Sequence, residues 1–264
     1  MYPFTLERPT STADAVNLAT AGGRPLAGGQ TLLASMKLRL TSADQLVDLA
    51  GIKDLTGICR DGDALVIGAM TRHADVASNA EVKALIPALA DLAGNIGDRQ
   101  VRAMGTLGGS VANNDPAACY PSAVLALGAT IHTNTRKIAA DDYFKGMFST
   151  ALKDGELITA ISFPIPKRAA YMKFKQPASR FAMVGVFLAQ FASGVRVAVT
   201  GASSDGVFRH AGLEQALSAN FTPQAAAGVK IDASGLNQDI HGTAAYRANL
   251  ISVQTQRAVT KALG

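Results

Sequence analysis

Two glycine pairs are the strongest candidates for cofactor-binding loops in this 264-residue sequence. Gly28-Gly29 separates a short extended run from a helical pattern, and the polar residues Gln30 and Thr31 follow it. Such a turn exposes backbone N–H groups with no side chain in the way, which suits a phosphate group. With Gly108-Gly109, a second loop could hold the same pyrophosphate from the other side. Taken singly, each pair is more typical of a tight turn than of a binding loop.

Other sequence patterns that carry chemistry are missing. The four histidines share no metal-ligand spacing, and the chain contains no HExxH, GxSxG, Walker A or GxGxxG motif. Cys59 and Cys119 lie too far apart in sequence for a CxxC pair, so this chain alone cannot hold an iron–sulfur centre. The sequence therefore offers no metal site, and we nominate no catalytic acid or base.

Composition narrows the class of protein. Hydrophobic residues make up 48% and charged residues 17% of the chain, which is enough for a sizeable core. The net charge is +5, and the basic residues are scattered rather than clustered as in a nucleic-acid-binding arm. No signal peptide and no stretch of ~18 apolar residues is present. We expect a cytoplasmic protein with reduced cysteines and no contact with nucleic acid or membrane.

The elements that must position the glycine pairs alternate between helix and strand. In the first part of the chain, Ser11 is expected to cap a helix that ends at Gly22-Gly23. The predicted elements that follow are a helix from Thr31 to Leu40, a hairpin over 55–68, helices over 72–78, 88–93 and 121–127, and a strand over 129–133. Pro164 and Pro166 mark a boundary. Beyond it, strands over 170–175, 184–191 and 195–201 precede helices over 212–219 and 246–263, which indicates a small α+β unit.

Several ordered motifs resemble one known family. They are Pro25–Leu33 with Met36–Arg39, Ile96–Arg102, Gly105–Ser110, Asn114–Ala118, Gly155–Ile158 with Phe163-Pro164, Lys173–Lys175 with Pro177–Ala182, and Tyr246-Arg247 with Arg257-Ala258. The chain is similar, nearly from end to end, to the FAD-binding medium subunits of molybdenum hydroxylases. That family includes the flavoprotein subunit of aerobic carbon monoxide dehydrogenase and the flavin domain of xanthine dehydrogenase.

The resemblance implies an α+β fold of the vanillyl-alcohol-oxidase (PCMH) type. Two subdomains, over residues 1–54 and 55–166, would enclose FAD, and residues 167–264 would form a C-terminal α+β domain of the carbon monoxide dehydrogenase flavoprotein type.

The resemblance also implies a set of cofactor-binding residues. The first segment would wrap the pyrophosphate, with the amides of Gly28, Gly29 and Gln30 donating hydrogen bonds; it comprises Pro25, Leu26, Ala27, Gly28, Gly29, Gln30, Thr31 and Leu32. From the second subdomain, Thr106, Gly109 and Ser110 would approach the flavin side and the pyrophosphate, with Asn113 and Asp115 beside them. Ile96 takes a position where some relatives carry an aromatic residue facing the flavin. Ile158 would pack near the adenine or ribose, and Lys175 near the isoalloxazine.

One position departs from the family pattern. Many relatives have an aspartate at the position of Cys119, and in some of them this carboxylate accepts hydrogen bonds from FAD hydroxyls. A thiol is a much weaker acceptor, so Asp115 or a backbone group could take over this role. The alternative interpretation of Cys119 is a small buried apolar residue at the start of a helix.

We therefore expect an electron-transfer subunit. Substrate would be oxidised at a molybdenum cofactor in a large subunit, and electrons would pass through [2Fe–2S] centres of a small subunit to FAD here and on to an acceptor. The assembly would be a dimer of heterotrimers whose substrate this chain does not reveal. Two alternatives remain: a self-contained FAD oxidase or reductase of the same fold, and a structural subunit whose flavin site has decayed.

Four basic residues flank the motifs, and they could contact acidic partner surfaces or simply be solvated: Arg99, Arg102, Lys173 and Arg180.

Overall fold

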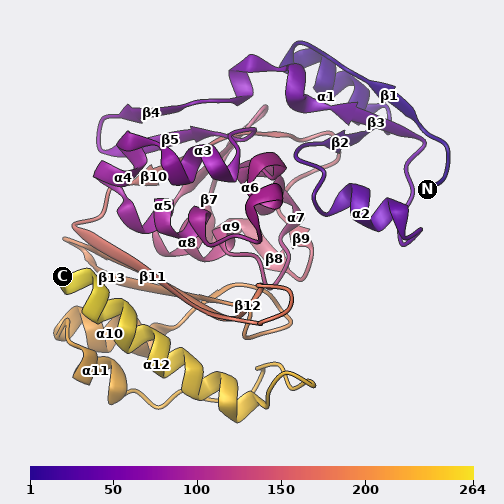
Figure 1. Cartoon of the computed structure of the whole chain (residues 1–264). Coiled ribbons are helices and arrows are strands. Elements are labelled where there is room, and N and C mark those ends of the chain that lie inside the picture. The colour runs from indigo at the N-terminus through magenta and orange to yellow at the C-terminus, as the bar shows by residue number, and fades with distance from the viewer.

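A computed structural model describes all residues from 1 to 264, and its elements stack in three tiers (Figure 1). The N-terminal tier is a small parallel sheet with strand order β1-β3-β2. Its elements are β1 (Thr5–Glu7), α1 (Thr12–Thr20), β2 (Arg24–Leu26), α2 (Leu32–Lys37) and β3 (Gln45–Asp48). The side chain of Ser11 accepts a hydrogen bond from the amide of Asp14, and Gly22 takes a positive φ of 101° after the helix. The predicted first helix is thereby confirmed.

The middle tier is an antiparallel sheet with strand order β4-β5-β10-β6-β7, covered by helices. The elements are β4 (Ile58–Asp61), β5 (Ala64–Gly68), α3 (His73–Ser78), α4 (Ala80–Leu85), α5 (Pro87–Gly94), α6 (Arg99–Met104), α7 (Leu107–Asn113), α8 (Tyr120–Ala126), β6 (Thr130–Thr133), β7 (Lys137–Ala139), α9 (Ala140–Tyr143), β8 (Phe144–Gly146), β9 (Ser149–Thr150) and β10 (Ile158–Pro164). The hairpin predicted over 55–68 is β4–β5, preceded by two short 3₁₀ turns.

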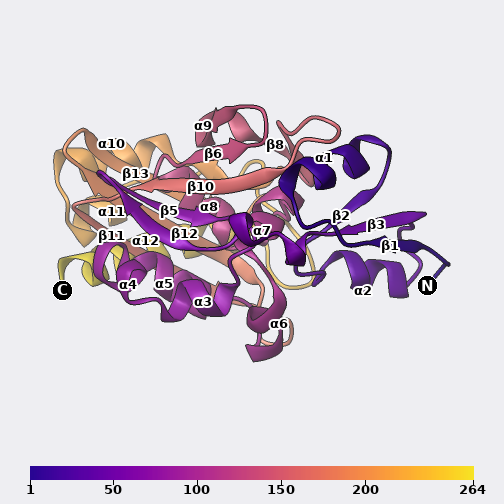
Figure 2. The same cartoon turned by 90° about the horizontal axis from the view of Figure 1, so that it is seen from above.

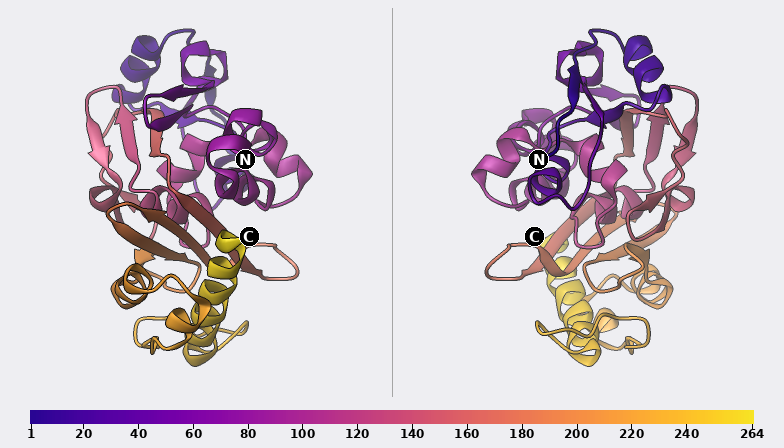
Figure 3. Two further views of the ribbon diagram at one scale, coloured as in Figure 1. Left: turned by 90° about the vertical axis from the view of Figure 1, so that its left-hand side faces the viewer. Right: turned by 90° about the vertical axis from the view of Figure 1, so that its right-hand side faces the viewer.

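The C-terminal tier is a sheet with strand order β11-β12-β13-β14 followed by helices. The elements are β11 (Arg168–Lys175), β12 (Ala182–Phe191), β13 (Gly194–Thr200), β14 (Phe208–Arg209), α10 (Ala211–Ala219), α11 (Pro223–Ala227) and α12 (Ala244–Leu263). The expected order, with strands first and helices after, is confirmed. Figure 3 shows α12 on the outer face of this sheet and the middle tier on the other. None of the helices combines the length and apolar character needed to cross a bilayer.

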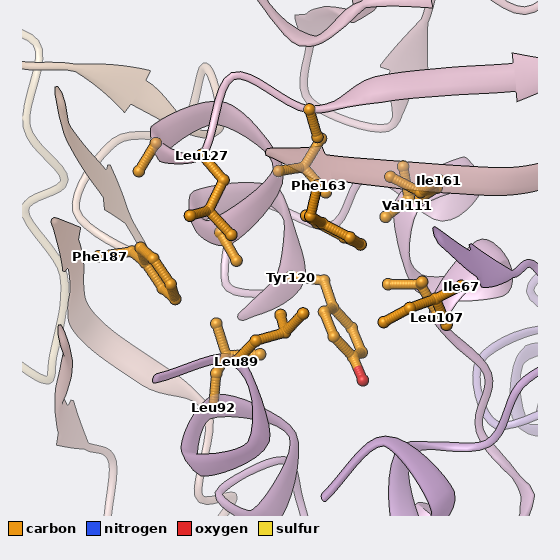
Figure 4. Packing of buried hydrophobic residues seen from close by; sticks show 14 of the residues in the cluster. Ile67, Leu89, Leu92, Leu107, Val111, Tyr120, Leu127, Ile161, Phe163 and Phe187 are labelled. Carbon is orange, nitrogen blue, oxygen red and sulfur yellow. The ribbon is translucent and has the colours of Figure 1, made fainter. Parts of the chain in front are cut away.

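Strand β12 lies between two hydrophobic cores. Val186 and Leu188 face the core formed with α10 and α12, whereas Phe187 and Ala189 belong to the main core of the middle tier. This alternation follows from the two-residue period of a strand. In Figure 4, Phe187 points toward Leu89 and Leu92 of α5. The C-terminal sheet therefore completes the core that supports the middle tier.

One local prediction is wrong, and one alternative interpretation does not hold. Helix α2 ends at Lys37, Arg39 takes a positive φ of 59°, and Leu40 is 76% exposed, so the helix does not continue to Leu40. Only Met36 of that helix is buried, which leaves little burial to extend it. The alternative interpretation of Gly108-Gly109 as a tight turn does not hold, because the two residues form the first turn of α7.

Candidate functional site: two glycine segments at a tier boundary

The first glycine loop, residues 27–31, joins β2 to α2 and presents free backbone donors. The amides of Gly28, Gly29 and Gln30 donate no hydrogen bond within the chain. Gly29 has a positive φ of 68°, and a Cβ there would lie 2.7 Å from Cδ1 of Leu33. The loop thus needs glycine to keep its shape. It leaves three N–H groups available to an anionic ligand.

In the second glycine segment, residues 105–109, the backbone amides of Leu107, Gly108 and Gly109 already donate hydrogen bonds to other groups of the chain. Leu107 donates to Thr71 O at 3.0 Å and Gly108 to Ala69 O at 2.8 Å. The amide of Gly109 donates to Oγ1 of the buried Thr106 at 3.2 Å, which caps α7. These hydrogen bonds fix the segment in place, so it acts as a rigid support.

The two segments are in direct contact. A Cβ on Gly28 would collide with the carbonyl oxygen of Met104 and would lie 2.6 Å from Cα of Gly105. A Cβ on Gly109 would lie 3.1 Å from Cβ of Ala27. Figure 2 shows α7 on the side of the middle tier that faces the N-terminal tier. The structure thus brings together residues that are far apart in sequence, at the boundary of two tiers.

Polar side chains continue from this contact along α7. Ser110 and Asn113 are half-buried and three residues apart, so they share one face of the helix. Asp115 Oδ1 accepts from the amide of Ala117 at 2.8 Å and so shapes the turn that follows. Asn114, with a positive φ of 44°, donates to Gly146 O and Ser149 O, both at 2.8 Å. These two hydrogen bonds of Asn114 connect the turn to the β8–β9 hairpin.

A second group of predicted residues meets around one lysine. Lys173 Nζ donates to Asn95 O at 3.0 Å and to Cys119 Sγ at 3.3 Å. Ile96 follows Asn95, and Cys119 is a buried free cysteine directly before α8. Arg102 donates to Ile96 O at 3.1 Å. Arg102 and Lys173 were expected to be solvated or to meet a partner subunit; they bond within the chain instead.

The remaining predicted residues take different positions. Ile158, at the start of β10, is 6% exposed and belongs to the main core. Lys175 is exposed at the end of β11. Pro25 is exposed, and Leu26 and Leu32 are half-buried on either side of the first loop.

Sequence reasoning missed His73, which lies behind the second segment. A Cβ on Gly105 would lie 2.6 Å from His73 Nε2, and the His73 backbone amide donates to Gly105 O at 2.9 Å. Burial, with a smaller contribution from the charge of Arg102, lowers the pKa of His73 to about 4, so the ring is neutral near pH 7. Its ring packs on Tyr120 with the centroids 5.2 Å apart. No sequence motif marks this contact, because the histidine lies more than thirty positions before the glycine segment it supports.

These features fit a dinucleotide cofactor. The free loop amides can donate hydrogen bonds to a pyrophosphate, and the close glycine contacts hold the loop in position. Half-buried polar side chains lie nearby.

The comparisons with known proteins decide the family. Residues 2–166 match the family described as the FAD binding domain in molybdopterin dehydrogenase. The chain belongs to this family. FAD is therefore its cofactor, and the chain is an oxidoreductase subunit.

Relatives match over nearly the whole chain. The carbon monoxide dehydrogenase medium chain of Afipia carboxidovorans is 35% identical over 98% of this chain and 96% of its own. The nicotine 6-hydroxylase medium subunit of Paenarthrobacter nicotinovorans is 32% identical over 96% of this chain and 95% of its own. The glyceraldehyde dehydrogenase medium chain of Sulfolobus acidocaldarius is 38% identical over 72% of this chain and 71% of its own.

Solved structures share the fold. Reconstituted CO dehydrogenase from Oligotropha carboxidovorans superposes with a TM-score of 0.91 at 34% identity, over 99% of both chains. Quinoline 2-oxidoreductase from Pseudomonas putida 86 gives 0.88 at 27% identity, over 98% of this chain and 96% of that chain. The expected α+β flavoprotein fold is thus confirmed.

Proposed function

We propose that this chain passes electrons from [2Fe–2S] centres of a partner subunit, through FAD, to an external acceptor. The observation that carries the proposal is the first glycine loop, whose three free amides lie against the second glycine segment. Relatives of similar length are medium chains of enzymes named for carbon monoxide and for nicotine. Such unlike substrates favour a shared role for this subunit that does not depend on the substrate.

The FAD site is assigned to the residues that the motifs indicate. The first loop would bind the pyrophosphate, Ser110 and Asn113 would offer side-chain hydrogen bonds, and Ile96 would pack on the flavin. Thr106 and Gly109 would hold the loop in place, because the Gly109 amide already donates to Thr106 Oγ1 and Gly109 lies close to Ala27. Asp115, Cys119, Ile158 and Lys175 complete the proposed set.

The residues of this chain bind and orient the cofactor and need not transfer a proton to substrate. FAD, when bound, supplies the redox chemistry, as cofactors generally do. His73 is held neutral behind the second segment, so it adds no charge to the site near pH 7. The proposed function thus requires no catalytic acid or base in this chain.

The partners we propose are a small [2Fe–2S] subunit and a large subunit with the molybdenum cofactor, as a dimer of heterotrimers. This proposal is supported by the relatives, which are named as medium chains or medium subunits. Electron transfer requires short distances, so one edge of the flavin site would face a partner.

The first test is cofactor content. The purified chain should be yellow, and denaturation with acid should release all of the FAD, since no histidine lies in a motif for covalent attachment. A colourless protein that takes up no added FAD would contradict the proposal and favour a structural subunit.

The second test is assembly. Co-expression with the two partner genes, followed by gel filtration and metal analysis, should give one complex that contains molybdenum and iron. The isolated chain should oxidise no small organic substrate. Full turnover by a monomer without molybdenum or iron would identify a self-contained oxidase instead.

A further inference from the structure

The turn between α5 and α6 is held by cations at three successive carbonyls. Arg102, from α6 itself, donates to Ile96 O at 3.1 Å and to Gly97 O at 3.4 Å. Lys173, from β11, donates to Asn95 O at 3.0 Å. The arginine bonds are local, whereas the lysine bond joins two tiers of the fold.

Lys173 lies on a strand face that runs from the core toward solvent. Tyr171, Lys173 and Lys175 alternate along β11, so their side chains share one face. Tyr171 is 3% exposed, Lys173 is half-buried and Lys175 is exposed. The Lys173 ammonium thus lies where the core ends and the proposed flavin region begins.

The same ammonium is connected to the second glycine segment through other side chains. Lys173 Nζ donates to Cys119 Sγ at 3.3 Å, and Cys119 precedes Tyr120. The Tyr120 ring packs on His73, which in turn contacts Gly105. A continuous chain of contacts therefore runs from Lys173 to the segment that supports the first glycine loop.

We infer that Lys173 is a positioning residue of the flavin site, which holds the Ile96 turn and the Cys119 end of α8 at a fixed spacing. The inference rests on the proposed FAD site. Hydrogen bonds to a charged donor contribute more than neutral ones, and an aliphatic replacement would leave Asn95 O without its partner. Loss of the ammonium would release Asn95 O, and with it the contact between the turn and β11, while Arg102 still holds Ile96 O and Gly97 O. No group proposed to touch FAD would be replaced.

The test compares Lys173→Met, Lys173→Arg and the control Lys167→Met in the full chain. Lys167 is exposed and directly precedes the same strand, so its replacement removes an equal charge without touching the turn. We expect Lys173→Met to raise the Kd for FAD by about tenfold, which is about 1.4 kcal/mol. The visible circular dichroism of bound flavin should change as well. Lys173→Arg should recover most of both signals, and Lys167→Met should match wild type.

Unfolding of the FAD-free proteins separates positioning from general stability. If Lys173→Met lowers the melting temperature but leaves the Kd and the flavin spectrum unchanged, the inference is overturned. If wild type itself binds no FAD, the proposed function fails instead.

A second measurement covers the case in which Lys173→Met does not fold. In a Cys59→Ser background, Cys119 is the sole thiol, and its alkylation can be followed by mass spectrometry. FAD should slow this alkylation several-fold, because the Cys119 end of α8 is proposed to lie beside the cofactor. Lys173→Gln in the same background should lose part of this protection, and protection equal to that with Lys173 present would overturn the inference.

Discussion

Gly28 lies directly against the carbonyl of Met104, although the two residues belong to different tiers. The contact is made through backbone atoms, so it leaves no room for any side chain at residue 28. The two glycine segments can therefore approach this closely only because residue 28 has no Cβ.

Gly28→Ala should abolish or greatly weaken FAD binding. The new methyl group would push the first loop away from Met104 and Gly105, which misplaces the free amides. Gly94→Ala is the matched control, because the nearest contact of its Cβ would be an ordinary 3.8 Å to Ala77. Flavin content after gel filtration measures both. Wild-type content in Gly28→Ala would show that the loop spacing does not matter.

Cys119→Asp should fold and should bind FAD at least as tightly as wild type. The carboxylate would sit beside the Lys173 ammonium, which now contacts the thiol at 3.3 Å. A charge-assisted hydrogen bond contributes about 1.5–3 kcal/mol. Titration with FAD, with Cys119→Ser as the uncharged control, measures the change. An unfolded Cys119→Asp protein would mean that the site cannot solvate a carboxylate.

His73 should make folding stability depend on pH below neutrality. Its pKa is about 4 in the folded chain against 6.5 for a free histidine, so the unfolded state binds the proton more tightly. The stabilisation is complete above pH 6.5 and is lost as the pH falls toward 4. The shift corresponds to about 3 kcal/mol. An NMR titration should show a His73 ring that stays neutral at pH 5.5; a midpoint near 6.5 would contradict the prediction.

Thr200→Val should weaken the connection between the C-terminal sheet and the turn after α7. Thr200 Oγ1 contacts Pro116 O at 2.9 Å and Ala118 O at 2.7 Å, and it is fully buried. We expect a loss of about 1–3 kcal/mol in the free energy of unfolding. Thr260→Val, at an exposed threonine of α12, should change it by less than about 0.5 kcal/mol. Denaturant unfolding measures both, and equal effects would contradict the assigned role of Thr200.

The sequence predicted the family, the fold class and most long elements, because their signals are local. Ser11 caps its helix through a residue three positions away, and the pattern of β12 is read within ten residues. Gly28 contacts Met104, and Lys173 contacts Asn95. Each contact joins two segments that are far apart in sequence, and no periodic pattern in the sequence predicts such a contact. In the sequence, Lys173 is one of several scattered cations. Its hydrogen bonds become evident only in the fold, where β11 packs against α5. The domain limits and the roles of the predicted FAD residues stay predictions.

The shared core has a consequence for how the protein matures. Phe187, Ala189 and Ala198 complete the main core from β12 and β13, and Gly201 donates to Pro116 O at 2.8 Å. During synthesis the ribosome releases these residues after the whole of the matched family region, residues 2–166. Until they emerge, the main core of the middle tier is open on one side. We therefore expect FAD loading to follow the completion of the chain rather than to accompany its growth.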